Sequence, residues 1–164
     1  MKYRVALEPV DQADVVTLIG ELDSHLEALY PAQSRHGLKL EALRATNILF
    51  SLARDEKGAA QGCGGIALLD GFAELKRMYV RPTSRGNGIG ALIVRFLEGQ
   101  ALARGYDVMR LETGYKQSEA LILYERLGYT PREPFAPYRP DPNSVFMEKR
   151  IGVNSSDPSI PRAG

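Results

Sequence analysis

Cysteine, histidine and tryptophan are scarce in this sequence of 164 residues, which contains one cysteine, two histidines and no tryptophan. Cys63, the single cysteine, cannot form a disulfide bond within the chain. His25 and His36 have no further ligand residue at the spacing typical of metal sites, so the sequence predicts no bound metal. The first residues also lack an apolar run of the kind found in signal peptides, and we therefore expect a cytoplasmic protein.

The chain has little net charge, because 21 basic and 20 acidic residues nearly cancel to a formal charge of +1. The two signs are intermixed along the sequence, without the concentrated positive charge that is typical of proteins that bind nucleic acids or anionic membranes. We therefore expect neither class of partner.

The length and composition of the chain predict one domain, since 44% of the residues are hydrophobic and the chain is long enough to bury a core. We place this domain at residues 1–151. Residues 152–164 are polar with scattered proline, which predicts a mobile C-terminal tail.

The pattern of apolar residues alternates between the periods of strands and helices. Short turns join three strands between residues 47 and 80, so these strands should pair antiparallel. A strand, a helix and a strand then follow, and this crossover makes two neighbouring strands parallel. We therefore predict an α/β fold of the α+β type, with a mixed, mostly antiparallel sheet of about seven strands whose central parallel pair is flanked by helices. The expected strands are 3–7, 47–54, 63–69, 72–80, 108–112, one starting at 129, and 145–151; the expected helices are 15–29, 38–45, 89–103 and 117–127.

A glycine-rich turn, Arg85-Gly86-Asn87-Gly88-Ile89-Gly90, connects the strand that ends at Val80 to an apolar helix that begins near Ala91. Glycines let the main chain approach a ligand closely, and the first N–H groups of a helix attract anions. Arg85 adds a permanent cation with several hydrogen-bond donors. The turn therefore predicts a phosphate-binding site.

Two nucleotide-binding patterns compete for this turn. Gly86, Gly88 and Ala91 satisfy the G-x-G-x-x-G/A pattern of dinucleotide-binding folds, and Glu112 lies where a ribose-binding acid would be sought. In that fold, however, the first glycine follows its strand almost directly, whereas residues 81–85 intervene here. A nucleotide P-loop needs a Gly-Lys pair, which the sequence lacks.

Two motifs in order resemble the GCN5-related N-acetyltransferase (GNAT) superfamily. Arg85-x-x-Gly88-x-Gly90 is similar to the R/Q-x-x-G-x-G/A signature of that family, and residues 73–82 are similar to its fourth strand. Residues 120–129, A-L-I-L-Y-E-R-L-G-Y, resemble its A-x-x-x-Y-E-x-x-G-F/Y segment. The resemblance covers about residues 1–151.

This resemblance implies that the protein transfers the acetyl group of acetyl-coenzyme A, as co-substrate and without a metal, to a primary amine by direct attack. It implies that Glu74 is the general base and Tyr124 the general acid; a salt-bridged strand carboxylate and a core tyrosine are the respective alternatives. Gln117 stands where many members have asparagine, so its amide is displaced by one methylene. The residues expected to bind the coenzyme are Met78, Tyr79, Val80, Arg85, Gly86, Asn87, Gly88, Ile89, Gly90, Ala91 and Gln117.

The acceptor is the least determined part of the prediction. An aromatic, proline-rich loop at 131–143 should face the segment around Tyr30 and His36, so that Tyr30, His36, Phe135 and Tyr138 line a pocket for a small-molecule amine. The alternative is that these aromatic residues merely pin the loop. A homodimer stays open, as do two rival functions: an acyl-coenzyme A sensor with little catalysis, and a dinucleotide-dependent oxidoreductase.

Overall fold

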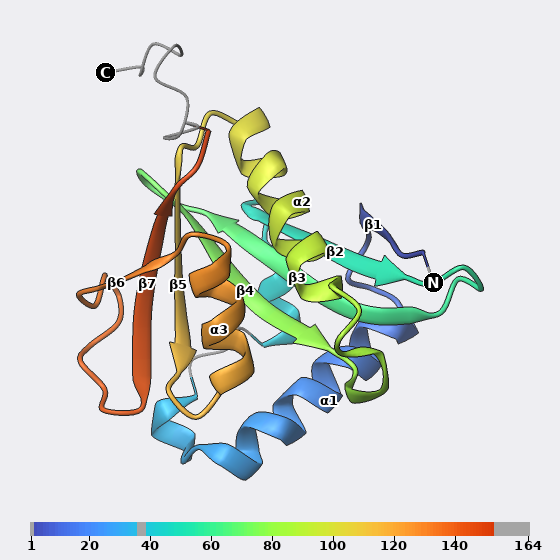
Figure 1. Ribbon diagram of the computed structural model, residues 1–164, viewed down its shortest axis with the longest axis horizontal. Coiled ribbons are helices and arrows are strands. Elements are labelled where there is room, and N and C mark those ends of the chain that lie inside the picture. The colour runs from blue at the N-terminus through green and yellow to red at the C-terminus, as the bar shows by residue number, and fades with distance from the viewer. Residues whose placement is uncertain (1, 36–38, 153–164) are drawn as a thin grey trace.

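The computed structural model describes residues 2–35 and 39–152 and contains a seven-stranded sheet in the order β1-β2-β3-β4-β5-β7-β6 (Figure 1). All neighbouring strands are antiparallel except β4 and β5, which are parallel. This confirms the predicted mixed sheet. The predicted tail lies outside the described residues apart from Gly152. The strands are β1 (Arg4–Leu7), β2 (Ile48–Arg54), β3 (Ala60–Leu68), β4 (Ala73–Val80), β5 (Val108–Gly114), β6 (Thr130–Arg132) and β7 (Ser144–Arg150).

In the described part of the chain, three α-helices cover the sheet, with α2 and α3 on one face and α1 on the other (Figure 1). Each face has its own buried cluster, one formed mainly by α2 with the central strands and one by α1 with β2 and β3. Within the segment predicted as a helix at 38–45, Leu40–Arg44 forms a 3₁₀ helix instead, and Leu38 lies outside the described residues. The helices are α1 (Ala13–Leu29), α2 (Ile89–Ala103) and α3 (Ser118–Arg126), and the 3₁₀ helices are η1 (Ala32–Ser34), η2 (Leu40–Arg44) and η3 (Pro82–Ser84).

A bulge in β4 changes the direction of its side chains half-way along the strand. Two residues of β4, Arg77 and Met78, lie opposite the single residue Gly64 of β3 in the pairing register. Arg77 has a φ of 57°, in the left-handed region that non-glycine residues rarely adopt. The carbonyl of Arg77 accepts a hydrogen bond of 3.4 Å from the thiol of buried Cys63.

Because of this bulge, Arg77 and Tyr79 face α1, whereas Leu75 and Met78 pack with the cluster on the α2 side. Strict alternation would have turned Arg77 toward α2. The second half of β4 therefore presents basic and aromatic side chains to α1.

The parallel pair of strands separates after a short stretch. β4 and β5 pair at three positions, which end at Leu75 and Leu111, although both strands continue beyond them. Figure 1 shows the two strands diverging toward their C-terminal ends. Beyond these positions β4 and β5 are no longer paired, and a cavity lies there between them.

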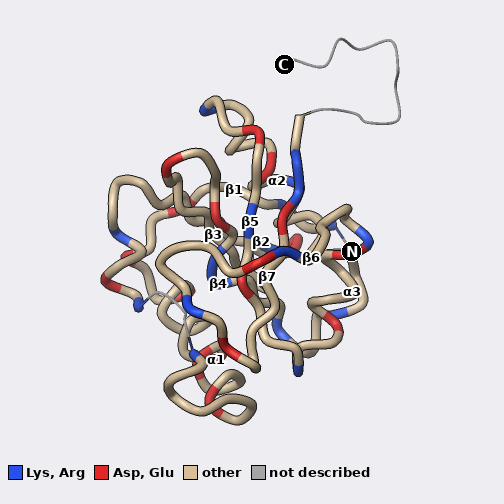
Figure 2. The backbone as a smooth tube through the Cα atoms, turned by 90° about the vertical axis from the view of Figure 1, so that its left-hand side faces the viewer, with Lys and Arg blue, Asp and Glu red and all other residues tan. Residues whose placement is uncertain are grey.

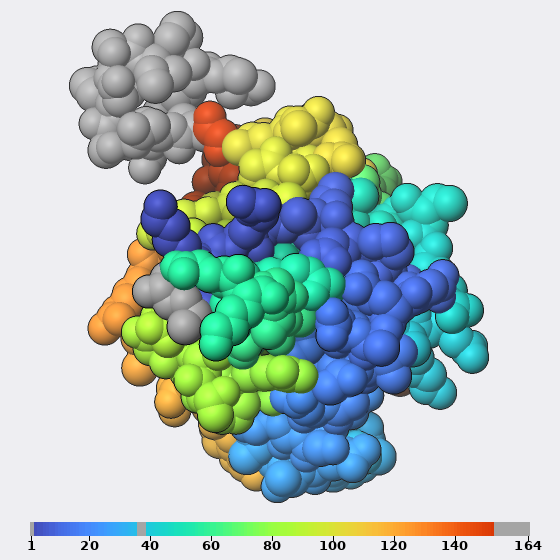
Figure 3. Space-filling model, turned by 90° about the vertical axis from the view of Figure 1, so that its right-hand side faces the viewer, coloured from blue at the N-terminus to red at the C-terminus, as the bar shows by residue number. Residues whose placement is uncertain are grey.

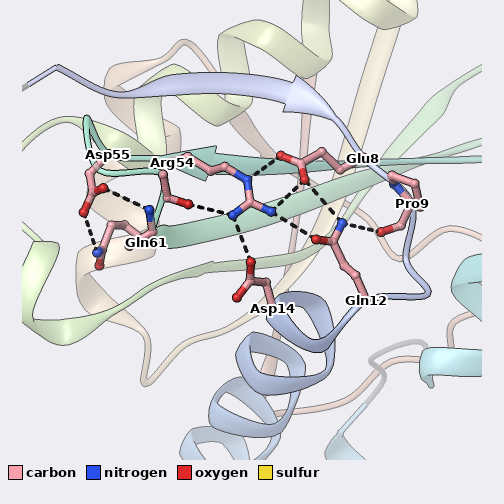
Figure 4. A network of polar contacts seen from close by, with 9 residues as sticks. Glu8, Pro9, Gln12, Asp14, Arg54, Asp55 and Gln61 are labelled. Carbon is pink, nitrogen blue, oxygen red and sulfur yellow. Dashed lines mark hydrogen bonds and ion pairs between the residues drawn. The ribbon is translucent and has the colours of Figure 1, made fainter.

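Arg54 joins three parts of the fold at the end of β2 (Figure 4). Its guanidinium donates to both carboxylate oxygens of Glu8, at 2.9 and 2.8 Å, and to Asp14 of α1 at 2.9 Å. It also donates to the Gln12 side chain and to the Gly58 carbonyl in the β2–β3 turn. The same turn lies against the N-terminal segment in Figure 3. Arg54 thus fixes the start of α1 relative to the sheet.

We expect Arg54→Met to lower the free energy of unfolding by about 2 kcal/mol at neutral pH, because charged hydrogen-bond partners lose their donor. The hydrogen bonds from Arg54 lower the pKa of Glu8. This stabilisation is therefore complete above the ordinary carboxyl pKa and is lost as the pH falls through the lowered folded-state value. Urea unfolding between about pH 3 and pH 7 should show this loss in the wild type. In the variant, the free energy of unfolding should change less over the acidic part of this range.

Arg44→Met is the matched control, because Arg44 pairs with Asp11 in a contact where both side chains are more than half exposed. Exposed ion pairs of this kind contribute little to stability. Equal losses in the two variants, or an unchanged acid side in Arg54→Met, would contradict the role assigned to Arg54.

Candidate active site

A cavity of about 540 Å³ lies at the separation of β4 and β5. Leu26 of α1 lines it from one face of the sheet, and Ile89 of α2 and Tyr124 of α3 line it from the other face. The cavity therefore connects both faces through the opening between the strands. The predicted site residues that line it are Tyr30, Glu74, Met78, Tyr79, Val80, Arg85, Gly86, Gly88, Ile89, Gly90, Ala91, Gln117, Tyr124 and Tyr138.

The glycine turn forms the end of the cavity on the α2 side. Gly86 and Gly88 have φ values of 83° and 78°, which side chains disfavour, and Gly88 is the N-cap of α2. No side chain caps this helix, and its first backbone bond runs from the N–H of Leu92 to the carbonyl of Gly88. The N–H groups of the preceding helical residues are thus free of intrahelical bonds and directed at the turn. This arrangement fits an anionic group such as a pyrophosphate.

Two polar residues of the turn differ in their relation to the cavity. The Nε of Arg85 donates to the carbonyl of Val80 at 3.0 Å, and its guanidinium lies 5.9 Å from the ring centroid of Tyr79. Asn87 does not line the cavity, because its amide donates to the carbonyls of Ser84 and Arg85 within the turn. The side chain of Asn87 therefore shapes the turn. Only the main chain of Asn87 could contact a ligand.

Tyr124 lies on α3 beside the opening and is 5% exposed. Its ring packs edge-on against Tyr129, with centroids 5.9 Å apart. Burial, together with the nearby charge of Glu112, raises the pKa of Tyr124 above the ordinary value of tyrosine. The phenol therefore keeps its proton at neutral pH.

Glu74 lies on the α1 side of the opening, where its side chain is almost completely buried. Its Oε2 atom accepts a hydrogen bond of 2.5 Å from the hydroxyl of Tyr138. The same oxygen forms an ion pair of 2.9 Å with Nζ of Lys76. Lys76 also donates to the Tyr138 hydroxyl at 2.7 Å. Burial and the Glu74 carboxylate raise the pKa of Tyr138, so its hydroxyl stays protonated. The three side chains form a closed triangle of hydrogen bonds at the cavity wall.

An aromatic cluster holds Tyr138 in this triangle. Phe135 packs edge-on against Phe72, Tyr138 and Phe146, with centroids between 5.3 and 5.6 Å apart. Phe135 is 5% exposed and does not line the cavity, which corrects its prediction as a pocket residue. Its apolar ring packs against the three other rings of the cluster, and this packing keeps it away from water. Of the two aromatic loop residues, Tyr138 alone reaches the site.

Tyr30 closes the cavity where α1 approaches the end of β5. Its hydroxyl accepts a hydrogen bond of 2.9 Å from the N–H of Lys116. The ring lies directly over Gly114, where the hydroxyl occupies the space that a Cβ would need. Tyr30 is thus both a wall residue and an anchor. His36, predicted beside it, lies outside the described residues.

The loop that carries Tyr138 is bonded to the segment after α1. Ser34 donates to Asp141 at 3.2 Å and accepts a hydrogen bond of 3.0 Å from the amide of Asn143. These contacts join the two segments that sequence reasoning placed on opposite flanks of the acceptor pocket. The cavity is therefore bridged at this end.

Several lining residues escaped the sequence analysis. Lys76 could have been found, because strand alternation puts it on the same face as Glu74. Arg77 could not, since only the bulge directs it toward α1. Its Nη2 pairs with Asp23 of α1 at 2.5 Å, and its side chain is 4% exposed. Arg35 and His25 also line the cavity, and no local motif marks either of them.

The acetyltransferase (GNAT) domain family matches residues 46–131, which include β4, the glycine turn, α2 and α3. A protein of Azospirillum brasilense named IAA acetyltransferase is 46% identical over 149 residues, which cover 90% of this chain and 97% of that protein. The chain belongs to the GNAT family. It is an acetyl-CoA-dependent N-acetyltransferase, as its family motifs predict.

Other relatives of this acetyltransferase agree with the assignment. The uncharacterised N-acetyltransferase YsnE of Bacillus subtilis is 35% identical over 150 residues, covering 90% of this chain and 99% of that protein. A crystal structure from Klebsiella pneumoniae, assigned to the acyl-CoA N-acyltransferases, superposes with a TM-score of 0.78 at 38% identity and covers 92% of this chain and 98% of its own. The PaiA N-acetyltransferase of Thermoplasma acidophilum, in complex with coenzyme A, shares the fold at 18% identity, with a TM-score of 0.70 and coverage of 92% and 100%.

The described part of this GNAT enzyme contains neither a membrane-spanning helix nor a group of metal ligands. None of its helices is long and apolar enough to cross a membrane. Among residues 2–35 and 39–152, no group of three or more metal-ligating side chains could hold an ion. Acidic and basic residues are interspersed along the backbone in Figure 2 rather than gathered on one face.

Proposed function

We propose that this enzyme acetylates the primary amine of a small molecule by direct attack on acetyl-coenzyme A. The main support for this proposal is that one cavity passes through the sheet between β4 and β5. The coenzyme, which supplies the acetyl thioester, would lie on the α2 side against the glycine turn. The acceptor would enter on the α1 side and meet the thioester in the opening.

The side chains at the opening support this assignment. Glu74 is the group that accepts the proton of the amine, and Lys76 and Tyr138 hold its carboxylate in place. Tyr124 stands on the other side with its proton retained and can donate it to the departing thiolate. Its raised pKa makes it a weaker acid than the thiol, whose ordinary pKa is about 8.5, so the transfer depends on close placement of the two atoms. The β4 main chain at Met78 and Val80 borders the same opening and can contact the pantetheine arm.

The bridged end of the cavity favours a small acceptor over an extended peptide. Hydrogen bonds from Ser34 and Asn143 join the two flanking segments, and Tyr30 and Tyr138 add bulky walls. A peptide substrate needs an open groove, whereas a small amine fits a closed pocket.

A thiol-release assay across a panel of amines tests the proposal. The panel should contain small primary amines, amino acids, lysine-containing peptides and IAA, because a 46% identical relative is named for IAA. Turnover of small amines with little activity on peptides is the expected result. Activity confined to peptides or to acceptors without an amine would contradict it.

For the best amine, we expect Glu74→Gln to lower turnover about tenfold at neutral pH, because the variant cannot accept the proton. The deficit should shrink as the pH rises, since solvent then deprotonates the amine. Glu125→Gln, an exposed residue on α3, is the matched control and should behave as the wild type. A deficit that is the same at every pH would remove Glu74 from the role of base.

A further inference from the structure

Basic side chains gather on the α1 side of the cavity, beyond the reacting groups. Arg35, Lys76, Arg77 and Lys116 line this part, whereas the lining carboxylates there are Glu74 and Glu112. The charge of Lys76 is already matched by Glu74. Arg77 is matched by Asp23, which does not line the cavity. The side chains that line this part thus carry four positive charges against two negative ones.

Arg35 and Arg77 each have a buried Nε without a hydrogen-bond partner in the described part of the chain, but Arg77 also has a close ion pair of 2.5 Å with Asp23. The side chain of Arg35 is two-thirds buried, with 31% exposed. Its ion pair is a long contact of 3.5 Å between Nη1 and Glu27, whose own side chain is 63% exposed. Such an exposed pair does little to compensate a partly desolvated guanidinium. The guanidinium of Arg35 thus has N–H groups at the cavity wall that could donate hydrogen bonds to a ligand.

The fold places Arg35 at the same end of the cavity as the proton acceptor. Arg35 directly follows Ser34, which is hydrogen-bonded to Asp141. Asp141 lies three residues after Tyr138, whose hydroxyl donates to Glu74. Arg35 and Glu74 line the same cavity, so an acceptor with its amine at Glu74 has a guanidinium in the same space.

Resting on the proposed function, we propose that the acceptor is a small amine that also carries a carboxylate, and that Arg35 binds this carboxylate. A guanidinium matches a carboxylate with two parallel hydrogen bonds, which gives both affinity and orientation. The amine then points to Glu74 and the opening. Arg35 is accordingly a specificity-determining residue, with no part in the proton transfers.

The test compares matched acceptors that differ only in this group. Glycine, β-alanine, 4-aminobutyrate and L-phenylalanine are each paired with their carboxamides, and rates are expressed per unprotonated amine. We expect at least one acid to exceed its amide in kcat/KM by about 10- to 100-fold, the range for hydrogen bonds to a charged group. Arg35→Gln should remove this preference by raising KM for the acid, with KM for acetyl-coenzyme A unchanged. Arg35→Lys should restore part of it.

Glu27→Gln separates this role from a structural one. If Arg35 matters only through its pair with Glu27, both variants should impair the enzyme alike. If Arg35 binds the acceptor, Glu27→Gln should keep the preference for acids. Amides used as well as acids by the wild type, or equal losses for acids and amides in Arg35→Gln, would overturn the proposal while leaving small-amine acetylation intact. Preference for O-phosphoethanolamine over every carboxylate would also overturn it.

A binding measurement decides the proposal independently of turnover. Calorimetry with phenylacetate and phenylacetamide, in the presence of coenzyme A, should show binding of the acid to the wild type and its loss in Arg35→Gln. If no small amine is acetylated, the proposed function fails, yet this result would still support a carboxylate site. Absence of phenylacetate binding together with absence of any acid preference would refute the site.

Discussion

Gly88→Asp should lower the affinity for coenzyme A by more than about 100-fold while the protein stays folded. A Cβ at position 88 meets no atom within 4 Å, so the side chain has room. The residue is the N-cap of α2 at a positive φ of 78°, which strains any side chain but which aspartate tolerates better than most residues. Its negative charge is favourable at the N-terminal end of the helix dipole. The same carboxylate would occupy and repel the position assigned to the pyrophosphate. Calorimetric titration with coenzyme A measures the loss.

Gly88→Asn provides the matched control. Asparagine has the shape of aspartate and tolerates the positive φ of 78° equally, but it carries no charge. We expect a smaller loss of affinity than with aspartate and a similar melting temperature. Unchanged affinity in a folded Gly88→Asp would show that the coenzyme does not use this helix end.

Tyr124→Phe should lower turnover by about 10², because it removes the proton donor and leaves the ring in place. The ring would still pack against Tyr129. Affinity for coenzyme A should hardly change, since the hydroxyl acts on the departing sulfur and not on the phosphates. Single-turnover kinetics, in which chemistry limits the observed rate, give the relevant comparison.

Tyr129→Phe removes a hydroxyl from the neighbouring buried tyrosine. This hydroxyl donates to Glu98 at 2.8 Å, and Tyr129 does not line the cavity. We expect a loss of stability of about 1 kcal/mol with turnover unchanged. Similar kinetics for the two variants would return Tyr124 to the core as a packing residue.

The glycine turn shows how much of the site local sequence can carry. Helix α2 spans Ile89–Ala103, the range expected from its apolar periodicity, and the turn before it places Gly86 and Gly88 at the positive φ values that glycine permits. Both features depend on residues close together in the chain, so the sequence alone suffices to predict them. The same applies to Tyr124, whose motif and helix are continuous.

The acceptor side required contacts between distant segments. Phe135 and Tyr138 are three residues apart and equally aromatic, yet the fold buries the first in an aromatic cluster and directs the second to Glu74. The position of Tyr138 depends on the aromatic cluster and on the bond from Ser34 to Asp141, which joins residues 107 apart in the chain. No local pattern distinguishes the two rings.

By itself, the sequence determined the family, the order of the elements, the mixed sheet, the glycine turn and the tyrosine on α3, because each rests on periodicity or on a motif within a few residues. Only the tertiary structure decided which side chains meet at the opening between β4 and β5. The bulge at Arg77 reverses the alternation on which a sequence prediction must rely, and the triangle of Glu74, Lys76 and Tyr138 forms through a loop whose Tyr138 lies 64 residues from Glu74 and 62 from Lys76. Long-range packing, rather than local preference, therefore sets which side chains meet on the α1 side of the cavity.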